Sequence, residues 1–229
     1  YRLRVKRSSE GTIADILGPE EEGGEEEFVN IYDIPKPLMR KLRPRMQIVF
    51  QDPYGSLNPT MTIFDIVREP LAISGLIRSP SKQAERVAEV LEDVGLVPPK
   101  DFFWRYPHQL SGGQRQRVAI ARAIVTNPDF VVADEPVSML DVSIRAGILD
   151  LLLRMRDKYN MSILYITHDL ATARHVCDRL AIMYLGKIVE MGDVEKVIFN
   201  PKHPYTKALL AAVPVPDPTV KRGAIPIKG

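Results

Sequence analysis

The chain has 229 residues, of which 45% are hydrophobic, 31 are basic and 29 are acidic. This length and composition predict one domain, or two small ones, with a real hydrophobic core. The net charge of +2 excludes a strong electrostatic case for a nucleic-acid partner.

The number of cysteines and the length of the apolar runs exclude further classes of protein. The single cysteine, Cys177, excludes a disulfide framework and fits a reducing compartment. Because Cys177 falls on an apolar stretch with helical spacing, we expect a small core residue and not a reactive thiol. No apolar run approaches membrane-spanning length, and neither a secretory leader nor an internal repeat is visible. We therefore expect a soluble chain with a single copy of its fold.

The first half of the chain contains one acidic segment and one clear strand. Residues 20–27 carry two acidic triplets around a pair of glycines, which favours a solvated loop over a metal site. Residues 46–50 read as a strand, and Gln51 ends it.

Helical patterns follow this strand. Thr62 and Asp65 have the spacing of a capping box that opens a helix. Ser81 is expected to open another helix, which Gly95 ends. The aromatic cluster Phe102, Phe103, Trp104 and Tyr106 contains a single basic residue, Arg105, so local packing is a better interpretation than nucleobase stacking. The inward residues of the second helix are predicted to be Ala84, Val87, Ala88, Leu91 and Val94.

A serine and two glycines, in the run Leu110-Ser111-Gly112-Gly113-Gln114, precede a further helical pattern. Ser111 is placed to cap that helix, and the glycines let the backbone approach a ligand. A helix N-terminus with bare amides is a site for an anion such as phosphate. An ordinary capped helix after a glycine turn is the alternative, and this segment alone would favour it.

Two carboxylates stand at the end of the next predicted strand. Residues 127–129 end the helix, and residues 130–133 form a short apolar run that is typical of a buried parallel strand. Asp134 and Glu135 follow at its carboxyl end, where ligands bind in open α/β sheets. Such a pair suits Mg²⁺ and an attacking water, with the two side chains on opposite faces.

A helix and another strand come next. Residues 143–159 have one apolar face, and residues 162–166 form a strand that ends in Thr167-His168-Asp169. Residues 179–184 and 187–191 read as strands around the tight turn Leu185-Gly186. The apolar face of the helix consists of Ile144, Ile148, Leu151, Leu152 and Met155.

Four motifs together resemble a known family. Residues 110–114, the pair Asp134-Glu135, residues 138–141 and His168 resemble the signature, Walker B, D-loop and H-loop of ATP-binding cassette (ABC) ATPases. Four ordered motifs at consistent spacing are very specific. The resemblance implies an α/β fold of the P-loop NTPase type. Its central, mainly parallel sheet has flanking helices, an antiparallel β part at the N-terminus and a helical signature subdomain.

Further segments resemble the oligopeptide/dipeptide importer branch of that family. They are residues 52–59, residues 106–108 and the run Asn-Pro-Lys-His-Pro-Tyr-Thr at 200–206, and the likeness covers about residues 28–216. The implied division is an incomplete N-terminal part of the ATPase core, the helical subdomain, the rest of the core and a C-terminal extension. Their expected bounds are 1–52, 53–127, 128–200 and 201–229. Some relatives carry an iron–sulfur cluster in that extension, but one cysteine predicts none here.

The family's phosphate-binding motif is missing. No G-x-x-x-x-G-K-[ST] match occurs in the sequence, although residues 12–18 resemble the helix that follows this loop. Residues 1–6 resemble the first strand, with Tyr1 placed to stack on adenine, and residues 28–34 resemble the next strand and turn. The sequence is then either an incomplete version of a longer chain, which we favour, or a natural cassette without its own loop.

The resemblance assigns a role to each candidate residue. Asp134 and Gln51 would bind Mg²⁺, Glu135 would be the general base, and His168 would contact the γ-phosphate of ATP. Gln51 would also report to the helical subdomain. A dimer would place four residues on ATP held by the second subunit, with Asp141 at the seam. The four residues are Ser111, Gly112, Gly113 and Gln114.

The resemblance also implies partners and leaves alternatives open. An importer subunit would lie at the cytoplasmic face of the membrane. It would bind permease subunits and a second ATPase subunit, with an extracytoplasmic substrate-binding protein as an indirect partner. A permease helix is expected to dock near residues 51–59. A soluble ABC ATPase and a non-enzymatic partner that supplies the signature motif in trans are the alternatives. The cargo (peptides, nickel or sugars) and the choice between homodimer and heterodimer stay open.

Overall fold

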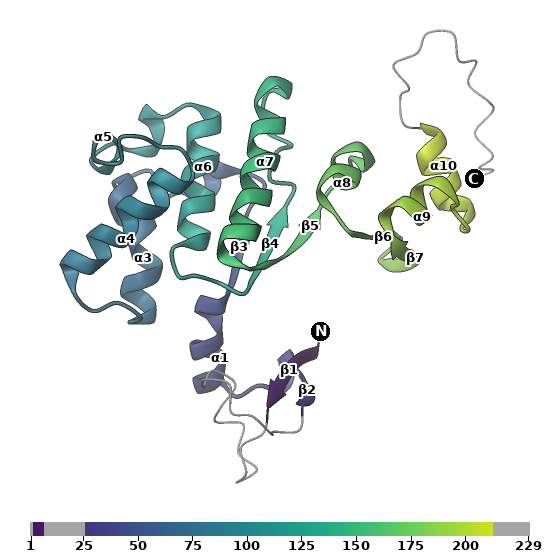
Figure 1. Cartoon of the computed structure of the whole chain (residues 1–229), viewed down its shortest axis with the longest axis horizontal. Coiled ribbons are helices and arrows are strands. Elements are labelled where there is room, and N and C mark those ends of the chain that lie inside the picture. Colours follow the sequence, from purple (N-terminus) through teal and green to yellow (C-terminus); the bar gives the residue numbers. More distant parts are fainter. Residues whose placement is uncertain (1, 7–25, 213–229) are drawn as a thin grey trace. The chain divides into compact units, whose positions relative to one another are not determined.

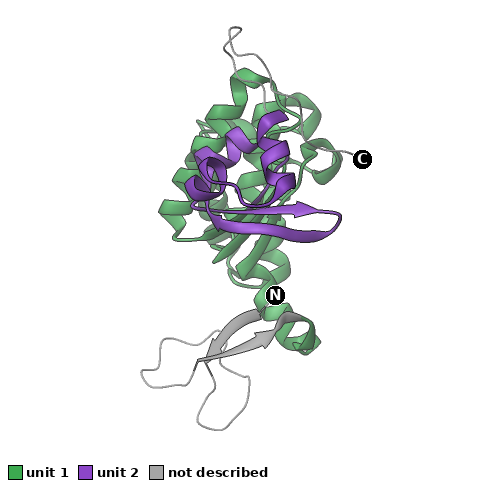
Figure 2. Ribbon diagram, turned by 90° about the vertical axis from the view of Figure 1, so that its right-hand side faces the viewer, with its two compact units in different colours: residues 1–164 green, residues 165–229 purple. Residues whose placement is uncertain are grey.

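The structure is a computed structural model that describes residues 2–6 and 26–212 (Figure 1). The predictions for Tyr1, for residues 12–18 and for most of the acidic segment lie outside the described residues. Contacts divide the chain into two units, residues 1–164 and 165–229 (Figure 2), which we treat one at a time.

The main sheet begins in the first unit. Its strands are β3 (Met46–Val49), β4 (Phe130–Asp134) and β5 (Ser162–Ile166), in the order β3-β4-β5. Strands β3 and β4 are parallel, with Met46 opposite Phe130, which confirms the prediction of a parallel sheet. Val131 and Ala133 of β4 are buried. Since parallel strands share one carboxyl edge, this register brings the residues after β3 and β4 together.

An antiparallel pair precedes this sheet, as expected. Strand β1 (Arg2–Lys6) pairs with β2 (Glu26–Asn30). The acidic segment was predicted as a loop through residue 27, but its last two residues belong to β2. A 3-10 turn (Ile31–Asp33), helix α1 (Lys36–Leu42) and a second 3-10 turn (Arg43–Arg45) then lead into β3.

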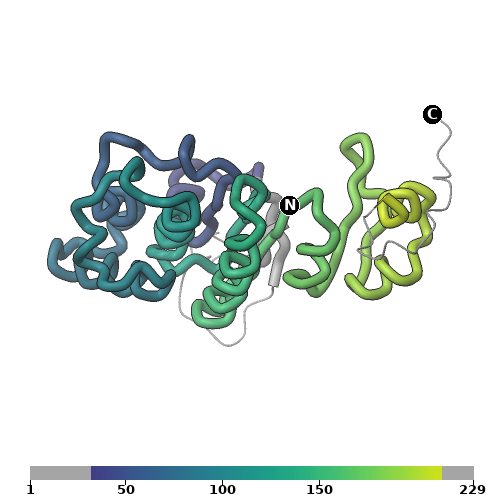
Figure 3. The backbone as a smooth tube through the Cα atoms, turned by 90° about the horizontal axis from the view of Figure 1, so that it is seen from above, coloured from purple at the N-terminus to yellow at the C-terminus, as the bar shows by residue number. Residues whose placement is uncertain are grey.

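Helices fill the segment between β3 and β4. They are α2 (Pro53–Ser56), α3 (Ile63–Ser74), α4 (Pro80–Asp93), α5 (Lys100–Phe103), the 3-10 turn Pro107–Gln109 and α6 (Gly112–Ile124). The tube in Figure 3 shows α3, α4 and α6 side by side, and contacts between all three pairs agree. Their facing side chains are fully buried, among them Ile66, Val87, Leu91, Ile120 and Ile124. Helix α7 (Val142–Tyr159) packs on α6 and buries Ile148, Leu151, Leu152 and Met155, as its pattern predicts, whereas Ile144 of the predicted face is half-buried.

The helix caps show one correct and one wrong prediction. Thr62 caps α3, because its Oγ1 accepts a hydrogen bond from Asp65 N at 3.2 Å. Ser81 was expected to open α4, but the N-cap is Ser79 and Pro80 is the first helical residue. Proline suits that position because the first amide of a helix has no intrahelical partner. Gly95 ends α4 in the left-handed region, with φ of 77°.

The aromatic residues near α5 pack locally, as expected. The ring of Phe64 lies 5.0 Å from that of Phe103 and 6.2 Å from that of Trp104, centre to centre. Trp104 nevertheless keeps 73% of its surface exposed.

The described residues of the second unit form a hairpin and three helices. Helix α8 (Leu170–Val176) precedes β6 (Arg179–Tyr184) and β7 (Lys187–Asp193), which pair antiparallel around the predicted turn. Leu185 and Gly186 are left-handed there, with φ of 48° and 75°. Helices α9 (Val194–Phe199) and α10 (Pro204–Ala212) follow. None of the helices described could cross a bilayer, since all are too short or too polar.

Cys177 differs in part from its prediction. It is the C-cap of α8 and is half-buried, so it lies at the end of the helix and not in its core. Burial and then the charge of Asp178 raise the pKa of its thiol, which agrees with an unreactive side chain.

One carboxylate anchors the C-terminal run of the importer type. Glu190 of β7 accepts hydrogen bonds from the backbone amides of Lys202 and His203, at 2.7 and 3.0 Å. These amides precede α10, and the ring of Tyr205 lies 4.3 Å from that of Tyr184. The run at 200–206 is therefore fixed to β7 of the same unit.

Candidate active site

The carboxyl ends of β3 and β4 bring two predicted site residues into contact. Gln51 follows β3, and its Nε2 donates a hydrogen bond to Oε2 of Glu135 at 3.0 Å. Asp134, the last residue of β4, is half-buried beside Glu135 in the chain. The amide and the acid pair therefore lie at one edge of the sheet. The bond orients the carboxylate of Glu135.

The backbone at Glu135 does not continue strand β4, so the prediction that Asp134 and Glu135 point to opposite faces of a strand does not apply. Its φ of 42° is left-handed, which is uncommon for a residue other than glycine. Its side-chain direction is therefore set by a turn, and the alternation along a strand does not apply. The amide and Oγ of Ser138 both donate to Glu135 O, at 3.1 and 3.0 Å, and hold this turn. Strain of this kind concentrates at functional sites.

The signature residues form the predicted cap of α6. Ser111 Oγ accepts from Gln114 N at 3.3 Å, and Gln114 Oε1 accepts from Ser111 N at 3.0 Å. This reciprocal pair is a full capping box. Ser111 is exposed. The start of α6 is therefore rigid and open to a ligand from outside.

The two signature glycines differ in their surroundings. A Cβ added at Gly113 would lie 3.0 Å from Cγ2 of Ile144, whereas one at Gly112 would lie 3.6 Å from Cδ2 of Leu140. A side chain at Gly113 would thus crowd Ile144 of α7, whereas one at Gly112 would make an ordinary contact. The signature therefore lies against the D-loop of its own chain.

The D-loop is held by an arginine that the sequence analysis missed. Arg145 Nε donates to Leu140 O at 2.9 Å, and its Nη2 donates to Ser138 O at 3.4 Å. Asp141 is the N-cap of α7, is exposed, and makes no capping bond with its side chain. Its exposed neighbours Met139 and Val142 are apolar. An exposed apolar pair around an acid is consistent with a surface that a second protein covers.

His168 lies in the second unit, two residues beyond the end of β5. Thr167 Oγ1 accepts from Asp169 N at 3.0 Å, and Asp169 caps α8 by accepting from Ala171 N at 2.9 Å. These bonds fix the backbone on both sides of His168, whose side chain is exposed.

Asp134 and Gln51 are the predicted metal ligands. In the part of the chain that the structure describes, no group of three or more His, Cys, Asp or Glu side chains could hold a metal ion. Asp134 and the amide oxygen of Gln51 are hard ligands of the kind that Mg²⁺ takes beside phosphate oxygens and water. The site fits a magnesium ion that arrives with a nucleotide.

Arginines attach the signature helix to its neighbours. Arg86 of α4 donates to Ile124 O and Val125 O at the end of α6, at 3.2 and 3.1 Å. Arg117 of α6 donates to Val94 O. Arg115 and Arg122 contact Tyr54 and Ser56 of α2. Both ends of α6 are therefore held in place.

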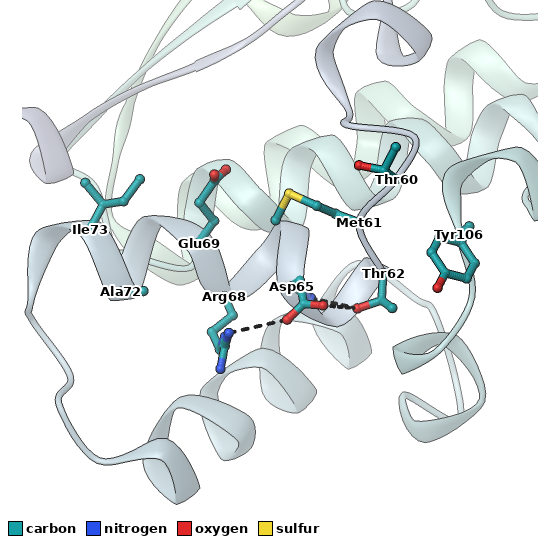
Figure 4. Close-up of a pocket in the computed structure, with 9 residues that line it drawn as sticks. All are labelled: Thr60, Met61, Thr62, Asp65, Arg68, Glu69, Ala72, Ile73 and Tyr106. Carbon is teal, nitrogen blue, oxygen red and sulfur yellow. Dashed lines mark hydrogen bonds and ion pairs between the residues drawn. The ribbon is translucent and has the colours of Figure 1, made fainter.

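A pocket of about 420 Å³ opens beside α3 (Figure 4). Thr60, the first lining residue along the chain, directly follows residues 51–59, where a permease helix is expected to dock. Asp65 and Arg68 form an ion pair at 3.4 Å in its wall. The lining residues are Thr60, Met61, Thr62, Asp65, Arg68, Glu69, Ala72, Ile73 and Tyr106.

Comparison with known proteins agrees with this geometry. The ABC transporter family matches residues 11–138, and the C-terminal region of oligopeptide/dipeptide transporters matches residues 189–229. The chain therefore belongs to the ABC transporter family. The earlier resemblance to its peptide-importer branch is confirmed, as is the α/β cassette fold.

Curated relatives carry transport names. The oligopeptide transport ATP-binding protein OppF of Bacillus subtilis is 47% identical over 181 residues, which is 79% of this chain and 59% of that protein. The glutathione import ATP-binding protein GsiA of Escherichia coli K12 is 51% identical over 185 residues, or 80% of this chain and 29% of that protein. The chain thus spans little more than half of OppF and under a third of GsiA.

Solved cassettes share the fold. CbiO1 of Clostridium perfringens, part of an ABC transporter complex, has a TM-score of 0.65 and 28% identity, with 77% of this chain and 68% of that chain covered. The cassette MJ0796, solved as a dimer bound to ADP and phosphate, has a TM-score of 0.60 and 31% identity, with 76% and 74% covered.

Sequence reasoning missed the arginines for a definable reason. Arg115 and Arg145 both lie in the first turns of helices, where a cation opposes the helix dipole. A positive charge in that position signals a specific partner, and both side chains do donate to backbone carbonyls. The position of each arginine in the first turn of a helix could be read from the sequence. The carbonyl groups to which they donate could not.

The glycine packing gives a testable expectation. Gly113→Ala should have a lower free energy of unfolding than Gly112→Ala, by roughly 1–3 kcal/mol, because its new methyl group is crowded against Ile144. Gly112→Ala is the matched control, since its methyl group meets only an ordinary contact. Urea unfolding of both variants measures the difference. Equal stability of the two variants would contradict the packing argument, and Ile144→Ala should relieve the cost in the double variant.

Proposed function

We propose that the chain is the ATP-binding and hydrolysing subunit of an ABC importer for peptides, peripheral at the cytoplasmic face of a membrane. The observation that carries this proposal is the bond from Gln51 to Glu135 at the carboxyl edge of two parallel strands. Ligands of open α/β sheets bind at that edge. The transport and import names of OppF and GsiA support a peptide cargo.

The chain's own residues take the roles that hydrolysis needs. Glu135, oriented by Gln51, is the general base that accepts a proton from the attacking water. Mg²⁺ bound with ATP would neutralise charge that develops on the phosphates. Asp134 would hold that ion, mostly through water, and His168 would contact the γ-phosphate. Catalysis then depends on positioning and electrostatics.

The working unit is a dimer of cassettes with composite sites. Exposure of the Ser111 cap and of the apolar residues around Asp141 supports this arrangement. The signature residues act on ATP that the second subunit holds, whether that subunit is the same chain or a paralogue. The permease subunits dock on residues 53–59 and the pocket beside α3, and the substrate-binding protein acts through them.

The absent phosphate loop favours a second role for this sequence. Without the loop's amides and lysine, the phosphates would face Asp134 and Glu135 with little compensation. The chain by itself is then a weak ATP binder. Its signature does not depend on that loop, so it can still complete the site of an intact partner.

The base is tested in a version of the protein that contains a phosphate-binding loop. Glu135→Gln should keep ATP binding and the Gln51 contact but lower hydrolysis by roughly 10²–10⁴-fold, because the amide cannot take up the proton. Steady-state phosphate release measures this, with Glu92→Gln on the exposed face of α4 as the control. Near wild-type hydrolysis by Glu135→Gln would remove Glu135 from the role of base.

The role in trans is tested with the 229-residue chain itself. Calorimetric titration with ATP and Mg²⁺ should give no binding in the micromolar range. Mixing with an intact paralogue should support hydrolysis, which Ser111→Arg should abolish because the larger side chain blocks the start of α6.

Ser79→Arg is the matched control for that mixture, since Ser79 is an exposed N-cap elsewhere in the subdomain and should leave hydrolysis unchanged. Micromolar binding by the chain alone would contradict the first expectation. Unchanged hydrolysis with Ser111→Arg would contradict the second.

A further inference from the structure

The turn that begins at Glu135 is closed by hydrogen bonds between its own residues. The amide and Oγ of Ser138 both donate to Glu135 O, at 3.1 and 3.0 Å. Leu140 N then donates to Val137 O at 3.2 Å. The φ of Glu135 is 42°, a value that a residue other than glycine keeps only where its surroundings hold it. The placement of the Glu135 carboxylate therefore depends on whatever holds this turn.

Arg145 of α7 holds the turn through two backbone carbonyl groups. Its Nε donates to Leu140 O at 2.9 Å, and its Nη2 donates to Ser138 O at 3.4 Å. Because a guanidinium is planar and rigid, these two donors fix the two carbonyl groups relative to each other. Arg145 is half-buried, so water competes less well for the carbonyl groups than it would on an open surface.

Leu140 gives this arrangement a fixed point. Its residue surface is 6% exposed, and a Cβ added at Gly112 would lie 3.6 Å from its Cδ2. Leu140 is therefore packed against the start of α6, and the shorter of the two Arg145 bonds goes to its carbonyl group. The contacts run from buried Leu140 through Arg145 to Ser138, and from Ser138 to the backbone of Glu135.

We infer that Arg145 is a positioning residue for hydrolysis, which acts on the general base Glu135 through the turn at Ser138. This inference rests on the proposed function, because it takes Glu135 as the base. Gln51 orients the carboxylate by a side-chain bond, whereas Arg145 supports the backbone that carries it. Removal of the guanidinium takes away the donors to two carbonyl groups, so the turn relaxes toward ordinary torsion angles and displaces the carboxylate.

A purely structural role for Arg145 is the competing explanation, and the kinetics separate the two roles. A structural loss lowers the amount of folded protein and so scales all activity by one factor. A positioning loss lowers kcat and leaves the KM for ATP unchanged, because the side chain acts on the base and not on the nucleotide. It also disappears once the carboxylate of Glu135 is gone, since both changes then affect one step.

The experiment uses the version of the protein that contains a phosphate-binding loop. Arg145→Met should lower kcat roughly tenfold to a hundredfold, the scale of loss that a displaced catalytic group causes. Arg145→Lys should recover part of it, since lysine keeps the charge and can still donate. Arg156→Met is the matched control in the last turn of α7, where Arg156 pairs with Asp157, and it should leave kcat unchanged. Steady-state phosphate release gives kcat and KM, and urea unfolding shows which variants are folded.

Two further variants make the test specific. In the Glu135→Gln background, Arg145→Met should change the residual hydrolysis of labelled ATP by less than about twofold. Ser138→Ala replaces Arg145→Met if that variant does not fold, because it removes only the Oγ bond to Glu135 O. It should also lower kcat at unchanged KM, and it should lose this effect in the Glu135→Gln background.

Several outcomes would overturn the inference alone. They are wild-type kcat in Arg145→Met (or in Ser138→Ala where the former does not fold), a raised KM at unchanged kcat, and equal losses in Arg145→Met and Arg156→Met. The same relative loss with and without the Glu135 carboxylate would also overturn it. Near wild-type hydrolysis by Glu135→Gln itself would instead overturn the base of the proposed function, and the inference with it.

Discussion

The hydrogen bond from Gln51 to Glu135 is the interaction on which the rest of the site depends. It exists because β3 and β4 are parallel and in register, so that their carboxyl ends meet. It joins Glu135, the proposed general base, to the segment that leads into the helical subdomain. A change in that subdomain thus has a short physical route to the chemistry. Glu135 has a left-handed backbone, which is unfavourable for a residue other than glycine, so the surrounding contacts must stabilise its position.

The signature helix is the second rigid body of the site. Its start is closed by the reciprocal cap of Ser111 and Gln114, and its end by Arg86. Close packing at Gly113 fixes its distance from α7, and Arg145 holds the D-loop between them. Rigidity of this kind suits the proposed contact with a second subunit, since groups that are already ordered lose less entropy on binding.

Most of the fold was predictable from periodicity and turn residues. The strands, the buried face of α7 and the capping of α3 and α6 follow from local patterns, and the four motifs identified the family. The failures have local causes. The cap of α4 is Ser79 and not the predicted Ser81, because Pro80 suits the first helical position. The direction of Glu135 was argued from a strand that ends one residue earlier. The bonds of Arg86, Arg117 and Arg122 to carbonyls join segments far apart in the chain, so no local pattern encodes them. Arg145 bonds carbonyls only five and seven residues away, and its place in the first turn of α7 was a usable signal.

The central claim is that the signature of this chain acts on ATP held by a second cassette. The most direct measurement is disulfide formation between Ser111→Cys here, with Cys177 replaced by Ala, and a cysteine placed in the phosphate-binding loop of an intact partner. The account predicts a crosslink that forms with ATP and is much weaker without it, because nucleotide closes the dimer. A crosslink that never forms, or that forms equally without ATP, would contradict the account.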